Sequence, residues 1–133
     1  MLFGLMITGI GTLIYLYAAE YLKRDENIHR FYCYLTLFMG AMLGVVLSDN
    51  LITLFVFWEL TSISSFFLIG YNTDQEASRK SAMWALGLTG LGGFFMLASF
   101  ALIGIVAGTY SLNELLAYPD VLLNNQYYYI IIF

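Results

Sequence analysis

Cysteine, histidine and proline each occur only once in this chain of 133 residues. The single Cys33 excludes an internal disulfide, and its place in an apolar run predicts a small, buried, hydrophobic side chain. Because His29 is the only histidine, the chain has no Cys/His cluster, and we expect no protein-built metal site, no haem and no other cofactor. A Walker-type phosphate loop is also absent from the sequence.

Charged side chains are scarce as well. They make up 11% of the residues, whereas 61% are hydrophobic. Soluble domains carry about 25% charged residues, so this composition predicts a protein of the lipid bilayer. No stripe of basic residues with interleaved aromatic residues is present, and we therefore expect no nucleic acid among its partners.

Long hydrophobic runs take the place of the missing charges. A run of about 20 residues, rising 1.5 Å per residue as a helix, covers the ~30 Å hydrocarbon core of a bilayer. The predicted spans are residues 2–22, 31–47, 51–71 and 81–107, and residues 127–133 resemble the start of another span. Because that last run is too short to cross, we expect the chain to be a fragment of a larger protein. The predicted fold class is all-α: residues 1–133 form a single polytopic transmembrane helix bundle, with four full spans plus the start of a fifth.

The segments between the spans contain signals for helix ends. Asp49 and Asn50 directly precede the third run, so either side chain is placed to cap that helix, and we favour capping as the role of Asp49. Further on, Ser111 is predicted to cap a short helix at 112–117, with Glu114 at the spacing of a capping box.

Orientation follows from the basic residues. All of them lie within the first and third gaps between spans, which are on one side of the membrane: Lys23, Arg24, Arg30, Arg79 and Lys80. The positive-inside rule places these loops in the cytoplasm. The sequence therefore predicts a multi-pass protein of the cell's inner (plasma) membrane with its N-terminus outside.

One ionisable residue, Glu59, lies near the middle of the run at 51–71. A bare carboxylate at that depth costs at least a few kcal/mol, unless it is protonated or meets a cation or water. Hydroxyl groups at Thr61, Ser62 and Ser64 are close along the chain and can form hydrogen bonds with a carboxyl group. This pattern predicts a proton or cation path through Glu59, Thr61 and Ser62. The alternative is a structural glutamate that joins two helices by a neutral hydrogen bond.

Small residues recur at helical spacing in two of the spans. Gly40 and Gly44 form a GxxxG pattern, and Thr89 and Gly93 lie four residues apart in the last full span. Such positions let helix backbones approach closely in a bilayer. We predict that these four residues serve helix packing.

Two stretches carry a resemblance to a known family. They read Arg30-Phe-Tyr-Cys-Tyr-Leu-Thr-Leu-Phe-Met-Gly-Ala-Met-Leu-Gly-Val-Val-Leu-Ser-Asp-Asn-Leu51 and Phe57-Trp-Glu-Leu-Thr-Ser-Ile-Ser-Ser-Phe-Phe-Leu-Ile-Gly-Tyr71. They resemble the antiporter-like subunits of respiratory complex I and its relatives. The Phe-Trp-Glu-Leu-Thr-Ser core is most similar to the large A-type subunit of multisubunit (Mrp-type) sodium/proton antiporters, since the complex I version typically has glycines flanking the Trp-Glu pair. The likeness covers nearly the whole chain, from the third to the sixth family helix.

The resemblance implies a role for Glu59. It matches the family's functional glutamate on the fifth helix, which pairs with a lysine on the seventh helix, beyond this chain. Lys80 is not that lysine, because it falls at the cytoplasmic end of a span. The implied protein is part of an antiporter complex with other subunits, and it exchanges H⁺ for Na⁺ or another monovalent cation. As a transporter subunit it would have no catalytic site of its own.

Two alternatives stay open on the sequence. The first is a proton-pumping membrane subunit of respiratory complex I (NADH–quinone oxidoreductase) or of a membrane hydrogenase, which would make the protein a translocase of the oxidoreductase type. Nothing in the chain recognisably binds NADH, a quinone or a cluster, and the basic residue that some complex I homologues carry is missing from 89–93. The second is a structural membrane subunit that transports nothing.

Overall fold

The computed structural model describes residues 1–22, 27–71, 76–117 and Ile130. Within these residues the chain forms helices and no strand. The helices are α1 (Leu2–Tyr21), α2 (Ile28–Leu47), α3 (Leu51–Ile69), α4 (Glu76–Ala107) and α5 (Leu112–Ala117). This architecture confirms the predicted all-α class, and α5 lies where the short helix was expected.

The four long helices of the described residues are each long and apolar enough to cross a membrane. Two of them begin earlier than the hydrophobic runs, since α2 starts at Ile28 and α4 at Glu76. A hydrophobic run marks only the part of a helix that suits hydrocarbon, whereas the backbone hydrogen bonds continue into polar residues. With 32 residues, α4 is about 48 Å long. The expected start of another span at 127–133 lies outside the described residues, apart from Ile130.

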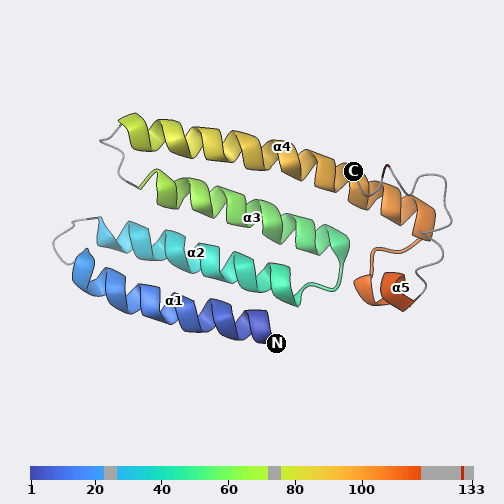
Figure 1. Ribbon diagram of the computed structural model, residues 1–133, viewed down its shortest axis with the longest axis horizontal. Helices are drawn as coiled ribbons and strands as arrows, with labels where there is room; N and C mark the ends of the chain where they lie inside the picture. The colour runs from blue at the N-terminus through green and yellow to red at the C-terminus, as the bar shows by residue number, and fades with distance from the viewer. Residues whose placement is uncertain (23–26, 72–75, 118–129, 131–133) are drawn as a thin grey trace.

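The long helices form one layer. Figure 1 shows α1, α2, α3 and α4 side by side in chain order, each antiparallel to the next, and each packs against its neighbour in the sequence. In this arrangement α3 is flanked by α2 and α4. Few hydrophobic side chains are buried in the narrow seams between helices: Ala18, Leu35, Ala41, Leu51 and Ala82. Both broad faces of the layer are therefore apolar and open to lipid or to further helices.

The open layer corrects one expectation about burial. Cys33 was predicted to be buried, but it is exposed on α2. Its neighbourhood is apolar along the sequence, yet only positions that point into a seam are covered in a single layer of helices. Cys33 therefore lies on an open face of the layer and not in a seam between helices.

Close approach of α2 and α3 depends on one glycine. A Cβ atom built on Gly44 would overlap the aromatic ring of Phe57, so the two helices can pack at this distance because position 44 has no side chain. At Gly40, the other half of the GxxxG pattern, a Cβ would meet nothing within 4 Å among the described residues. Gly40 is on the exposed surface of α2, available to another helix.

The N-terminus of α3 is capped by Asn50. Its Oδ1 accepts hydrogen bonds from the backbone N–H groups of Ile52 at 2.9 Å and Thr53 at 3.3 Å. Of the two residues predicted for this cap, the structure assigns it to Asn50, and the capping role favoured for Asp49 serves another helix. Asn50 is the residue whose extended backbone directly precedes the helix, and that position brings its side chain over the first free N–H groups.

Asp49 caps a different helix. Its Oδ1 accepts a hydrogen bond from the backbone N–H of Asn113 at 3.1 Å, and its Oδ2 accepts one from the Ser111 hydroxyl at 3.0 Å. The predicted capping box of α5 is also absent, because the Glu114 carboxylate accepts a hydrogen bond from the Thr109 hydroxyl instead. A carboxylate is a stronger acceptor than a hydroxyl, so Asp49 takes the position over the α5 N-terminus that the sequence assigns to Ser111.

Candidate functional site

Glu59 lies near the middle of α3, away from both ends of the helix. Its Oε1 atom is buried and has no hydrogen-bond partner among the described residues. An unpaired carboxylate in an apolar environment is strongly disfavoured. The buried oxygen therefore needs a partner that the described residues do not supply.

The buried oxygen is directed toward α4. A Cβ atom built on Gly93 would overlap Oε1 of Glu59, would lie 3.0 Å from its Cδ and would lie 3.6 Å from its Oε2. Gly93 is itself buried in the seam between α3 and α4. The carboxyl group thus occupies the space that any side chain at position 93 would fill.

The neighbouring hydroxyl groups donate to their own helix and not to Glu59. Thr61 Oγ1 donates to the carbonyl of Trp58 at 2.6 Å, and Ser62 Oγ donates to the same carbonyl at 3.4 Å. Ser64, which is fully buried, donates to the carbonyl one turn before it at 2.8 Å. Each hydroxyl oxygen keeps its lone pairs, so Thr61 and Ser62 can still accept a hydrogen bond from water or from an acid.

The remaining packing residues lie apart from Glu59. Thr89 is exposed on α4, and its hydroxyl donates to the carbonyl of Ala85 at 2.8 Å. Of the four positions predicted to serve packing, Gly44 and Gly93 face neighbouring helices, whereas Gly40 and Thr89 face away from the seams. A packing role for Gly40 and Thr89 stays a prediction about helices outside the described part of the chain.

No cation of the described residues is close to the carboxyl group. Lys80 precedes Gly93 by thirteen residues on α4 (93 minus 80), which is about 20 Å along the helix axis. The parts of the chain that the structure describes contain no group of three or more His, Cys, Asp or Glu residues able to hold a metal ion. A cationic partner for Glu59 would have to come from outside the described residues.

Two segments of the chain match known protein families. The family described as the transmembrane region of NADH:quinone oxidoreductase/Mrp antiporter matches residues 48–133, which include α3, α4 and α5. A second model, the chain 5 N-terminus of NADH-ubiquinone oxidoreductase (complex I), matches residues 1–32. The chain belongs to the NADH:quinone oxidoreductase/Mrp antiporter family. The resemblance expected from the Trp-Glu core is confirmed.

Individual members of this family are similar over most of the chain. The A1 subunit of the Na(+)/H(+) antiporter of Staphylococcus haemolyticus is 54% identical over 116 residues, which are 87% of this chain and 14% of the relative. The corresponding A subunit of Alkalihalophilus pseudofirmus is 49% identical over 127 residues, 95% of this chain and 16% of the relative. The A1 subunit of Staphylococcus aureus strain JH9 is 44% identical over 128 residues, 96% of this chain and 16% of the relative. The chain spans about one sixth of the length of these relatives.

Two features of this region were not predicted from the sequence. Gly93 was assigned to helix packing, but its contact with Glu59 was not foreseen, because it depends on the relative rotation and shift of α3 and α4. The sequence signal that could have suggested this contact is a carboxylate within one span together with a small residue within the next span. The contact between Asp49 and α5 joins residues 62 positions apart and leaves no local signal.

Proposed function

We propose that the chain is part of a multisubunit monovalent cation (Na⁺)/proton antiporter and that Glu59 lies on its proton or cation path. The observation that carries the proposal is the buried Oε1 atom, which has no hydrogen-bond partner in the described residues and abuts Gly93. The similar proteins are named as A and A1 subunits of Na(+)/H(+) antiporters, and these names support the same function.

In this proposal Glu59 alternates between a protonated state and a charge-paired state. A cation close to a carboxylate favours its charged form, and withdrawal of the cation favours protonation. The cation would be the lysine that the family resemblance implies, or the transported ion. Thr61 and Ser62 would hold water beside the carboxyl group through their free lone pairs.

The membrane arrangement is part of the proposal. The N-terminus would face outward across the plasma membrane, and the loops with the basic residues would face the cytoplasm. Other subunits, or further helices of a longer protein, would cover parts of the apolar faces of the layer in Figure 1. The chain would act as a transporter subunit, with no catalytic site of its own.

The proton-pumping alternative is weighed on the family descriptions and on the relatives. The description that matches residues 48–133 names both NADH:quinone oxidoreductase and the Mrp antiporter, whereas the one that matches residues 1–32 names complex I alone. The relatives with 44–54% identity are named antiporter subunits, and this favours antiport. A structural subunit without transport is the other alternative, and it requires a different test.

The test replaces Glu59 in the full-length parent complex. Glu59→Gln keeps the size and hydrogen-bonding ability of the side chain but removes its charge and its titration. We expect sodium-dependent proton exchange in everted vesicles to fall to background, by about a hundredfold or more, because a positioned proton acceptor is lost. Glu59→Asp should retain part of the exchange, since the acid is kept but withdrawn by one methylene group.

The matched control is Glu76→Gln, which removes an acid from the exposed start of α4. It should leave exchange unchanged. Assembly of all variants is measured by the recovery of the complex. Normal exchange by Glu59→Gln at equal abundance would contradict the proposal and favour the structural alternative.

A further inference from the structure

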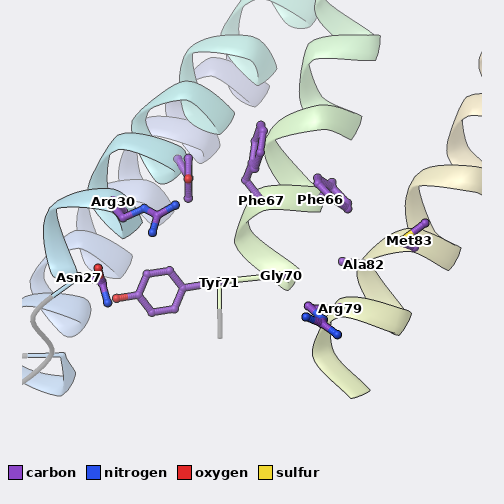
Figure 2. Close-up of a pocket in the computed structure, with 10 residues that line it drawn as sticks. Asn27, Arg30, Phe66, Phe67, Gly70, Tyr71, Arg79, Ala82 and Met83 are labelled. Atoms are coloured by element: carbon purple, nitrogen blue, oxygen red, sulfur yellow. The ribbon is translucent and has the colours of Figure 1, made fainter. Parts of the chain in front are cut away.

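A cavity of about 480 Å³ lies at one end of the helix layer, where α3 ends and where α2 and α4 begin. Figure 2 shows Arg30 on the α2 side and Arg79 on the α4 side, with Gly70 and Tyr71 of the α3 end between them. The volume falls within the range of sites for small molecules, about 300–1,000 Å³. This cavity is separate from the Glu59 carboxyl group.

Its charged lining is positive. Arg30 and Arg79 both contribute to the cavity wall, and both side chains are exposed. Among the described residues neither guanidinium group forms an ion pair, although Glu76 lies one turn before Arg79. Arginine presents several N–H donors in a planar fork, a geometry that suits phosphate oxygens.

Apart from the polar Asn27, the rest of the wall is apolar or aromatic. Phe66 and Phe67 project from the last turns of α3, and Met83 lines the α4 side. Met83 is 69% exposed, so the cavity continues onto the open apolar face of α4. A ligand that fills this space must combine an anionic group with a hydrocarbon portion.

The cavity also lies at a suitable depth in the membrane. Helix α3 ends at Ile69, and α4 begins at Glu76 and is about 48 Å long. Because the hydrocarbon core is only about 30 Å thick, the first turn of α4 with Arg79 reaches the headgroup layer. Basic pockets between transmembrane helices at this level bind lipid head groups.

We propose that this cavity binds the phosphate-bearing headgroup of an anionic phospholipid. Arg30 and Arg79, on opposite walls of the cavity, supply the positive charge that attracts the headgroup, and an acyl chain lies along Met83 and the apolar face of α4. A free phosphate ion would use the two guanidinium groups but would leave the phenylalanine rings without an apolar partner. The proposal does not depend on ion exchange by Glu59, and the two can fail separately.

The experiment measures lipid binding to the full-length parent complex by native mass spectrometry. Phosphatidylglycerol, an anionic lipid, is titrated in parallel with zwitterionic phosphatidylcholine. Arg79→Gln should weaken phosphatidylglycerol binding about fivefold, and Arg30→Gln combined with Arg79→Gln about thirtyfold, since each basic residue near the surface contributes roughly a factor of five. Lys80→Gln is the matched control: it removes a charge at the adjacent position, which does not line the cavity, and should change binding less than twofold.

Several results would overturn the proposal. Unchanged binding in the double variant would do so, and so would equal losses in Arg79→Gln and Lys80→Gln, which would indicate diffuse surface charge. Inorganic phosphate at about 10 mM should not displace the lipid; displacement would indicate a site for a soluble anion. If the wild-type complex binds no phosphatidylglycerol in preference to phosphatidylcholine, the cavity is covered by another protein segment.

A second measurement uses the wild-type complex and therefore does not depend on the folding of any variant. A phosphatidylglycerol analogue with a photoreactive group in its acyl chain should label the peptide that contains Met83. Excess phosphatidylglycerol should suppress the labelling, whereas phosphatidylcholine should not. Labelling that never includes the first three turns of α4 would contradict the site.

Discussion

Gly93 keeps open the space in which the Glu59 carboxyl group lies. The methyl group of an alanine at this position would overlap Oε1, and both backbones are fixed by the packing of α3 against α4. The carboxyl group would have to turn out of the seam. Displacement of a reacting group by about 1 Å can reduce a rate a hundredfold.

We therefore predict that Gly93→Ala in the full-length parent lowers sodium-dependent proton exchange at least tenfold. The abundance of the complex should not fall, because alanine is a better helix former than glycine. Gly92→Ala is the control, since a Cβ there meets nothing within 4 Å among the described residues. Equal exchange by the Gly92 and Gly93 variants would show that the position of the carboxyl group is unimportant.

The N-termini of α3 and α5 both lie near the α2–α3 turn, and each is capped by a different side chain. Asn50 binds the first N–H groups of α3, while Asp49 binds the N–H of Asn113 in α5. The backbone strengthens this link, because the Leu112 N–H donates to the Asp49 carbonyl at 2.7 Å. Adjacent side chains thus stabilise two helices that are far apart in the sequence.

Asp49→Ala should loosen α5 and leave α3 intact. Loss of hydrogen bonds to a charged group costs about 1.5–3 kcal/mol, so hydrogen exchange at the Asn113 amide should accelerate at least tenfold. The reciprocal variant, Asn50→Ala, should accelerate exchange at Ile52 and Thr53 by a smaller factor, because a lost cap costs about 1 kcal/mol. Hydrogen exchange of the backbone amides, measured by mass spectrometry on the purified complex, would test both variants. The cap assignments fail if the two variants affect the same amides.

The two ends of the helix layer differ: one end contains basic residues, and the other end is next to α5. Helices α2 and α4 both begin at one end of the layer (Figure 1), and their first turns contain Arg30 and Arg79. The described residues of the α2–α3 turn and of α5 contain no lysine or arginine. By the positive-inside rule we expect the basic end to face the cytoplasm, as in the proposed topology.

This orientation predicts the labelling of single cysteines in a Cys33→Ala background. In intact cells an impermeant thiol reagent should react with Asn113→Cys on α5, which is exposed. It should not react with Asn27→Cys or Glu76→Cys, which would react only in everted vesicles. Labelling of position 27 or 76 from outside would reverse the proposed topology.

The sequence by itself determined the helices, their order and the family. Hydrophobic runs separated by short polar segments predict transmembrane helices because a bilayer admits only backbones whose hydrogen bonds are satisfied within the helix. The short helix at 112–117 and the unusual position of Glu59 were also evident, since both depend on residues that are close along the chain.

Only the tertiary structure decided which residues meet across the seams. That Gly93 faces Glu59, that Gly44 faces Phe57 and that Asp49 caps α5 all depend on how each helix is rotated and shifted against its neighbour. Lipid and protein side chains are about equally apolar, so hydropathy cannot distinguish a seam from a lipid-facing surface. For the same reason Cys33 was predicted to be buried and is exposed.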